Sequence, residues 1–179
     1  MSQAKFNVRK VAVLGAGVMG AQIAAHLVNA KVPTVLFDLA AKEGDKSAIA
    51  KKAIEGLKKL KPSPLAGKDR ADFITPANYD EHLSLLKECD IVIEAIAERM
   101  DWKADLYAKV APFLGEHTIF ATNTSGLSIN QLAESCPADA RSRFCGVHFF
   151  NPPRYMHLVE IIPCVTSNAE MLDNLERFL

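Results

Sequence analysis

Val11 to Gly20, VAVLGAGVMG, places four apolar residues directly before three glycines at the spacing Gly-x-Gly-x-x-Gly. This order predicts a buried strand, a tight turn and then a helix. In that arrangement Gly15 turns the chain sharply off the strand, Gly17 leaves room for a pyrophosphate against bare backbone, and Gly20 lets the helix approach the sheet closely. The stretch therefore predicts a dinucleotide-binding turn.

The residues after the glycines favour the same interpretation. Met19, Ile23 and Leu27 recur at helical spacing, so an amphipathic helix is expected to continue to Ala30. Its first backbone N–H groups, at Val18 and Met19, would face the pyrophosphate, where the helix dipole adds attraction. A glycine-rich turn can also serve only to pack a helix on a strand, so the next residues decide between the two.

A second apolar run, Val35 to Phe37, ends on Asp38. This position is roughly 20 residues beyond the glycines, where dinucleotide-binding folds place a carboxylate against the adenosine ribose. A carboxylate there accepts hydrogen bonds from both ribose hydroxyls and repels a 2′-phosphate, so the sequence predicts NAD rather than NADP. The alternative is that Asp38 only caps the next helix.

Length and composition narrow the class of protein. The chain has 179 residues, about one domain, and its 21 basic and 21 acidic residues favour a small-molecule partner over nucleic acid or an anionic membrane surface. The four cysteines are far apart and form no Cys-x-x-Cys pair, which argues against zinc and redox motifs, so no metal is expected. The first ten residues lack the apolar core of a signal peptide, and no run is long enough to span a membrane. We expect a soluble, cytoplasmic protein.

Strands and helices are predicted to alternate along the rest of the chain. We expect helices over residues 41–60, 101–114, 128–133 and 168–179, and strands over residues 73–75, 90–95, 118–121, 144–149 and 158–162. This alternation implies an α/β fold of Rossmann type, a doubly wound, mostly parallel sheet with helices on both faces. Polar turns just beyond the carboxyl ends of such strands form the ligand site.

Two of the predicted helices carry specific expectations. In residues 41–60 the buried stripe is Ile49, Ala53, Leu57 and Leu60. The opposite face holds four lysines that are either simply solvated or contact the phosphates of a nucleotide-tailed substrate: Lys51, Lys52, Lys58 and Lys59. In residues 101–114 Asp101 is expected to cap the helix, and Trp102, Leu106 and Val110 to face the core.

Four stretches together resemble the NAD-binding domain of the 3-hydroxyacyl-CoA dehydrogenases, including those within multifunctional fatty-acid oxidation proteins. These are GAGVMGAQIA, DIVIEAIAE, ATNTSGLSI and GVHFFNPPRYMHLVEIIP. The resemblance spans nearly the whole chain and implies NAD-dependent oxidation of (S)-3-hydroxyacyl-CoA to 3-oxoacyl-CoA in fatty-acid β-oxidation. The segment Lys61 to Leu65 departs from the longer helical hairpin of the smaller family members.

His148 is the candidate general base. Oxidation of a secondary alcohol needs a group that takes the hydroxyl proton while hydride leaves, and histidine titrates in the right range. Glu160, on the following strand, could fix the ring through one nitrogen and leave the other as the base. A lone histidine is more often structural, but the resemblance identifies His148 and Glu160 as the family's catalytic pair.

The resemblance assigns further roles within the same site. Ser125 matches the serine that hydrogen-bonds the substrate hydroxyl, and Glu98 and Lys103 match positions near the nicotinamide half of the cofactor. Asn123, in the same turn as Ser125, and Asn151, before the prolines, are expected to contact the cofactor or substrate. The alternatives are that Ser125 and Asn151 only shape turns and that Glu98 and Lys103 are ordinary surface charges.

We expect residues 1–179 to form one NAD-binding domain of a longer enzyme. The resemblance implies a following helical domain for substrate binding and dimerisation, absent from this chain, and a full-length protein that is a homo-oligomer or part of a multifunctional complex. The apolar stripe of residues 172–179 is expected to lie exposed without that domain. Two alternatives are a non-catalytic NAD-binding module and a dehydrogenase of another small hydroxy acid.

Overall fold

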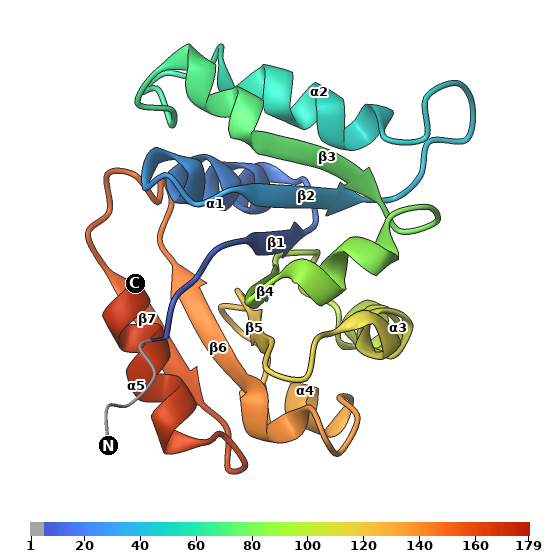
Figure 1. The fold of residues 1–179 in the computed structure, drawn as a ribbon, viewed down its shortest axis with the longest axis vertical. Helices are drawn as coiled ribbons and strands as arrows, with labels where there is room; N and C mark the ends of the chain where they lie inside the picture. Colours follow the sequence, from blue (N-terminus) through green and yellow to red (C-terminus); the bar gives the residue numbers. More distant parts are fainter. Residues whose placement is uncertain (1–5) are drawn as a thin grey trace.

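The computed structural model describes residues 6–179 and contains one seven-stranded sheet in the order β3-β2-β1-β4-β5-β6-β7 (Figure 1). Neighbouring strands are parallel, except that β7 runs antiparallel to β6. The strands are β1 Val11–Leu14, β2 Thr34–Asp38, β3 Ile74–Asn78, β4 Ile91–Glu94, β5 Ile119–Thr122, β6 Phe144–Phe149 and β7 Val159–Pro163.

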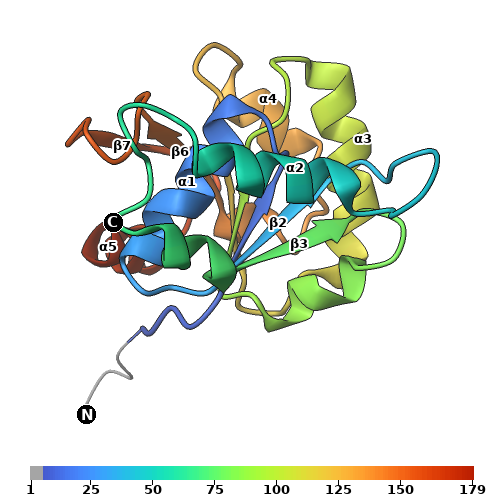
Figure 2. The ribbon, with the colours of Figure 1, turned by 90° about the horizontal axis from the view of Figure 1, so that it is seen from above.

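Helices cover both faces of this sheet, which confirms the predicted Rossmann-type architecture. The α-helices are α1 Val18–Asn29, α2 Ala48–Leu57, α3 Met100–Val110, α4 Ile129–Glu134 and α5 Ala169–Phe178. Short 3₁₀ helices also occur, η1 Lys68–Phe73, η2 Leu83–Glu88, η3 Ala111–Phe113 and η4 Arg141–Arg143. One apolar cluster joins the sheet to α1, α2 and α5, and a second joins its other face to α3 and α4. Figure 2 shows α1 and α2 next to each other.

The central strands form because their residues are apolar on both faces. Every residue of β1, β4 and β5 is buried, as expected for parallel strands covered by helices on both sides. Glu94 is the one charged residue among them, and its burial requires partners that the sequence alone did not identify.

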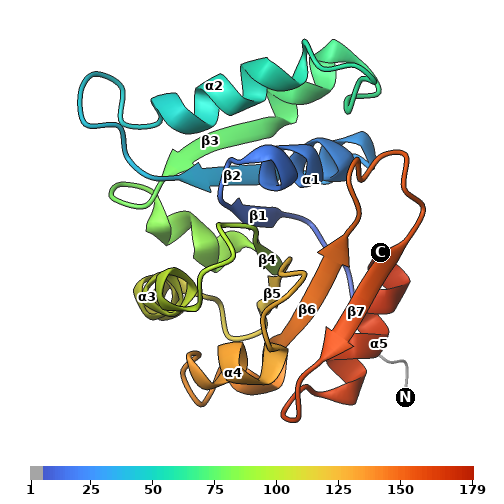
Figure 3. The ribbon, with the colours of Figure 1, turned by 180° about the vertical axis from the view of Figure 1, so that it is seen from behind.

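The antiparallel pair of β6 and β7 sets the position of the candidate catalytic residues. In this register His148 lies directly opposite Glu160. Figure 3 shows the two strands side by side, with α5 next to β7. The sequence predicted both strands, and the structure adds that the second one reverses direction.

The prediction of one helix over residues 41–60 is wrong at both ends. Residues 41–47 form a loop in which Gly44 has a positive φ of 70°. Asp45 then turns the chain into α2, because its carboxylate and its carbonyl accept hydrogen bonds from the backbone N–H groups of Ser47 and Ala48. The buried stripe agrees with the prediction only at Leu57. Its members are Ala50, Ile54 and Leu57, whereas Ile49 and Leu60 are exposed.

The helix predicted over residues 101–114 also differs from the structure. Arg99, not Asp101, is the N-cap residue of α3, and the α-helix ends at Val110. The side chain expected in the core, Trp102, is 50% exposed, and its neighbour Lys103 is buried instead. Leu106 and Val110 are buried as predicted, so the predicted buried face is wrong only at Trp102.

The terminal helix corrects a further expectation. The Asn168 side chain caps α5 by accepting a hydrogen bond from the Met171 backbone N–H. Met171 and Leu175 are buried in the cluster beneath the sheet, and only Leu179 of the predicted stripe stays exposed. Most of the stripe thus packs on this domain's own sheet.

We expect no signal peptide in the first ten residues. Residues 1–5 of that stretch lie outside the described residues. Within residues 6–179, no helix combines the length and the apolar character needed to cross a membrane.

Candidate cofactor and catalytic site

The three glycines of the turn are there for two different reasons, the fold itself and the space beside the backbone. Gly15 has a positive φ of 104°, and a Cβ on Gly20 would lie 1.8 Å from the Gly15 carbonyl oxygen, so the fold itself requires both. A Cβ on Gly17 would have no protein atom within 4 Å. Gly17 therefore opens onto free space at the start of α1, where Val18 and Met19 present backbone N–H groups. This space fits a pyrophosphate.

Asp38 is oriented by the glycine turn and not by a helix cap. Its Oδ2 accepts a hydrogen bond from the Ala16 backbone N–H at 2.6 Å, and its Oδ1 accepts one from Leu39 at 2.7 Å. The N-cap residue of α2 is Ser47, so the alternative that Asp38 caps that helix is wrong. Asp38 lines a pocket of about 470 Å³ together with Gly15 and Gly17. A carboxylate has about four acceptor positions, so each oxygen can still accept another hydrogen bond.

Glu98 holds the turn that contains Ser125. Its carboxylate accepts hydrogen bonds from the Thr124 hydroxyl at 2.5 Å and from the Ser125 backbone N–H at 2.8 Å. Burial raises the pKa of Glu98, but these hydrogen bonds and the positive charge of Lys103 outweigh burial and lower the pKa below its usual value. Glu98 is therefore a structural part of this turn and not a free surface charge.

The two asparagines each connect separate elements. Asn123 Oδ1 accepts a hydrogen bond from the Phe149 backbone N–H at 2.9 Å, which ties the end of β5 to the end of β6. Asn151 Oδ1 accepts one from Gln22 Nε2 at 3.1 Å, which ties the loop after β6 to α1. Both asparagines thus have defined orientations beside the glycine helix and the Ser125 turn.

His148 and Glu160 form the pair that the sequence predicted. His148 Nδ1 lies 2.8 Å from Glu160 Oε2, and the imidazole also packs against the Phe150 ring at a centroid distance of 4.6 Å. A carboxylate at Nδ1 fixes the ring orientation and leaves Nε2 to exchange a proton with a ligand. The arrangement can act as a general base next to a bound alcohol.

A buried polar cluster lies behind these residues, and sequence reasoning missed it. The Glu94 carboxylate accepts hydrogen bonds from Lys103 Nζ at 2.6 Å, Tyr107 Oη at 2.8 Å and Thr122 Oγ1 at 2.7 Å. It also accepts one from the Ile96 backbone N–H at 2.7 Å. The Lys103 side chain is only 1% exposed, so the alternative that Lys103 is an ordinary surface charge is wrong. The signal in the sequence was Glu94, a charge within an apolar strand.

These residues come from different elements but meet at one edge of the sheet. Asp38 is the last residue of β2, and His148 lies near the end of β6. The glycine turn, Glu98 and the Ser125 turn follow the carboxyl ends of the parallel strands β1, β4 and β5. This edge is where open α/β sheets bind ligands. Within residues 6–179, no three His, Cys, Asp or Glu side chains are grouped in a way that could hold a metal ion.

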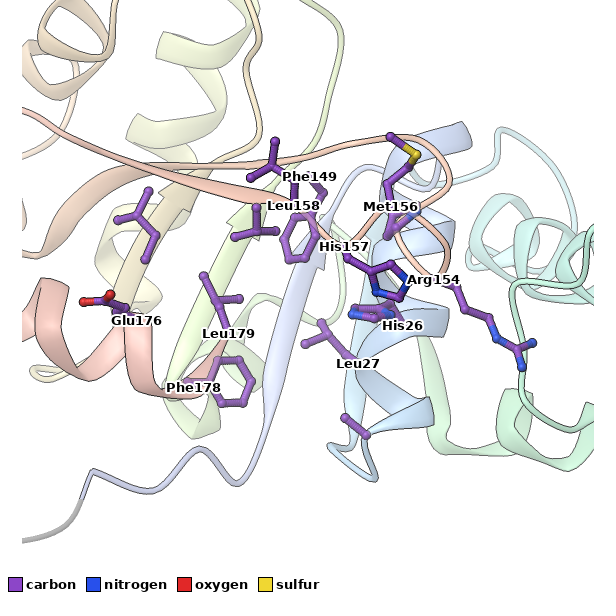
Figure 4. Close-up of a pocket in the computed structure, with 14 residues that line it drawn as sticks. His26, Leu27, Phe149, Arg154, Met156, His157, Leu158, Glu176, Phe178 and Leu179 are labelled. Atoms are coloured by element: carbon purple, nitrogen blue, oxygen red, sulfur yellow. The ribbon is translucent and has the colours of Figure 1, made fainter.

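A separate hollow of about 410 Å³ lies away from this edge, between α1, the loop after β6 and the end of α5 (Figure 4). It is lined by Leu27, Phe149 and Phe178, with His26 and Arg154 at its polar side. Burial, followed by the positive charge of Arg154, lowers the pKa of His26 below its usual value. Phe149 and His148 alternate along β6, so this hollow and the His148–Glu160 pair lie on opposite faces of the sheet.

Comparison with known proteins identifies the protein family that this chain resembles. The family profile described as "3-hydroxyacyl-CoA dehydrogenase, NAD binding domain" matches residues 10–179. A Rickettsia felis protein named as a fatty acid oxidation complex trifunctional enzyme is 44% identical over 174 residues, which cover 97% of this chain and 24% of that protein. The human mitochondrial hydroxyacyl-coenzyme A dehydrogenase is 35% identical over 185 residues, which cover 99% of this chain and 57% of that protein.

Solved structures show the same likeness. The 3-hydroxybutyryl-CoA dehydrogenase from Escherichia coli K12 superposes with a TM-score of 0.81 at 31% identity, covering 97% of this chain and 36% of that one. The chain thus spans between about a quarter and somewhat more than half of the length of these relatives.

Proposed function

The chain belongs to the 3-hydroxyacyl-CoA dehydrogenase family as its NAD-binding domain, and we propose that the protein containing it oxidises (S)-3-hydroxyacyl-CoA to 3-oxoacyl-CoA in fatty-acid β-oxidation. The observation that carries this proposal is the His148–Glu160 pair, with 2.8 Å between Nδ1 and Oε2, at the ligand-binding edge of the sheet. A binding module would not need an oriented imidazole at that place.

The residues of this chain divide the reaction between them. Bound NAD supplies the acceptor for the hydride that leaves the substrate carbon. His148 Nε2 removes the proton of the substrate hydroxyl as the carbonyl forms, and Glu160 keeps the imidazole in the required tautomer and stabilises its protonated form. Ser125 Oγ hydrogen-bonds the substrate oxygen and holds it next to His148. Glu98 positions Ser125 through the backbone hydrogen bond at 2.8 Å.

We assign the cofactor contacts by their position around the two halves of NAD. The turn and the first helical residues would hold the ADP half, namely Gly15, Gly17, Val18, Met19, Gly20 and Asp38. The nicotinamide half would lie near Glu98, Lys103, Asn123 and Asn151. Lys103 is paired with Glu94 and is only 1% exposed, so we place it behind the residues that contact that half.

Substrate comparison in the full-length protein tests this function. We expect NADH-dependent reduction of acetoacetyl-CoA to be much faster than reduction of acetoacetate, because the CoA part positions the reacting carbon. Equal rates with both compounds would favour a dehydrogenase of another small hydroxy acid. Absence of reduction with either, in protein that binds NAD, would favour a non-catalytic module.

The remaining assignments are also proposals. We propose residues 1–179 as one domain, acyl-CoA as the substrate class, and a homo-oligomer or a multifunctional enzyme as the assembly, since the Rickettsia relative is named as a trifunctional enzyme. We propose a cytoplasmic location from the sequence, whereas the pig and human relatives are named as mitochondrial.

A further inference from the structure

The pocket that contains Asp38 extends beyond the position expected for the ribose. Besides the glycine turn and Asp38, its lining includes Tyr79 and, from α3, Trp102 and Leu106, which we call its second end. A dinucleotide placed with its pyrophosphate at Gly17 and its ribose at Asp38 would direct the adenosine base into this second end. The volume of about 470 Å³ is enough for a nucleoside.

The floor of this second end is rigid. The Tyr79 ring is buried and stacks on Phe37 of β2, with a centroid distance of 5.8 Å and an interplanar angle of 16°. Leu106 of α3 is also buried. Aromatic and aliphatic side chains that are already packed lose little entropy when a flat ring covers them.

The wall is Trp102, in the first turn of α3. Its indole is 50% exposed, which is unusual for the largest apolar side chain, and it lines the pocket. The Arg99 guanidinium lies over the indole, 4.5 Å from the ring centroid. Arg99 is itself held by Asp101, with Nη2–Oδ2 at 2.6 Å and Nε–Oδ1 at 3.1 Å. This Asp101–Arg99–Trp102 stack fixes the indole in the pocket wall.

We propose that Trp102 is the residue that recognises the adenine ring of NAD, by stacking against it, and that Arg99 and Asp101 are positioning residues for the indole. This inference rests on the NAD assignment and not on the proposed oxidation of acyl-CoA.

Fluorescence of the unmodified chain provides the first test, because Trp102 is its single tryptophan. Titration with NAD and with ADP-ribose should change the tryptophan emission in a saturable manner, since an adenine stacked on the indole alters its surroundings. Nicotinamide mononucleotide, which lacks adenine, should give no saturable change. A saturable change of equal size with nicotinamide mononucleotide, or none with NAD that calorimetry shows to bind, would overturn the proposal.

Affinity measurements provide the second test. Trp102→Ala should weaken binding of NAD and ADP-ribose by about tenfold, and Trp102→Phe should restore most of it, because one base–aromatic stack has about this value. The matched control is Phe73→Ala. Phe73 is similarly exposed at 54% and also lies beneath an arginine, Arg70 at 6.0 Å, but it does not line the pocket. Equal affinities of Trp102→Ala and Phe73→Ala would overturn the proposal.

The same measurements separate this inference from the proposed function. If Trp102 controls NAD affinity but the full-length protein does not reduce acetoacetyl-CoA, the function fails and the adenine assignment stands. If acetoacetyl-CoA is reduced and Trp102→Ala binds NAD normally, the adenine assignment fails alone. Because Trp102 is half exposed, its replacement should not unfold the chain, and circular dichroism checks this directly.

Discussion

His148 is held in place by two contacts that do not involve a ligand, the Glu160 carboxylate and the Phe150 ring. In the full-length protein we expect His148→Gln to lower kcat by a factor of ~10² to 10⁴, the usual contribution of a positioned acid or base. The NAD dissociation constant should change little, because the imidazole acts on the substrate hydroxyl. Steady-state kinetics and calorimetry check both values. A large fall in melting temperature with normal activity per folded molecule would instead make His148 structural.

Gly17 differs from the other two glycines of the turn because nothing in the protein occupies the space beside it. We expect Gly17→Val to fold normally and to lose NAD binding, since its side chain would fill the place of the pyrophosphate. Calorimetry gives the affinity, and thermal unfolding confirms the fold.

Gly56 provides the matched control for this change. It lies in α2, and a Cβ there also has no neighbour within 4 Å. Gly56→Val should keep wild-type NAD affinity. If Gly17→Val binds NAD as well as Gly56→Val does, the pyrophosphate does not lie at this turn.

The lowered pKa of Glu98 predicts how the stability of the folded chain changes in acid. Its pKa in the folded protein lies below the usual value of 4.5. The carboxylate therefore stabilises the fold above that value, and this contribution is lost as the pH falls through the lower, folded pKa. We expect the difference in melting temperature between the wild type and Glu98→Gln to be largest near neutral pH and to shrink below about pH 4.5. A difference that stays constant down to pH 3 would show that Glu98 gains nothing from ionisation.

Among the elements, α3 depends on one buried ion pair. Lys103 of α3 donates to Glu94 of β4 at 2.6 Å, and neither side chain reaches solvent. Removing one partner of such a pair leaves an uncompensated buried charge, so Lys103→Met should lower the free energy of unfolding by about 3–5 kcal/mol. The double variant Glu94→Gln with Lys103→Met should recover part of this loss. Chemical denaturation measures both.

A control for this change lies on the same helix. Lys109 pairs with Asp80 at 3.5 Å, and both side chains are about half exposed. Lys109→Met should therefore cost about 1 kcal/mol or less. Similar losses for Lys103→Met and Lys109→Met would mean that the buried pair contributes no more than a surface pair.

The α3 helix shows which features could not be predicted from the sequence. Periodicity placed Trp102 in the core, whereas the buried stripe is Lys103, Leu106, Tyr107 and Val110. A lysine in that stripe is stable only because the carboxylate of Glu94, on β4, balances its positive charge. Such a pairing between the side chains of a strand and the helix that follows it leaves no periodic signal in either segment. In contrast, the glycine turn and the apolar strands depend on local chemistry, and the sequence predicted them correctly.

Across the whole molecule, topology explains why the pairing of His148 with Glu160 was predictable. Parallel strands bring their carboxyl ends to one edge, and the loop between β6 and β7, residues 150–158, returns Glu160 to His148. The path of that loop was not predictable. Arg154 Nη1 donates to the carbonyls of Ser63 at 2.8 Å and Leu65 at 2.5 Å, and Tyr155 Oη donates to Ser63 at 2.7 Å. These contacts join two irregular segments about 90 residues apart.

The arrangement of the site also predicts how this chain behaves alone. The predicted cofactor pocket is lined by the turn after β1, the end of β2 and α3, all within this chain, whereas the Glu160 side chain is 49% exposed at the outer strand. Hydride transfer requires the reacting carbon within about 3–3.5 Å of its acceptor and a site closed to water. We therefore expect the 179-residue chain to bind NAD, and to prefer it to NADP because of Asp38, but to reduce acetoacetyl-CoA far more slowly than the full-length protein. Calorimetry with both dinucleotides and an NADH oxidation assay test this. Turnover equal to that of the full-length protein would show that this chain alone positions the acyl-CoA, and equal affinity for NADP would remove Asp38 from the ribose site.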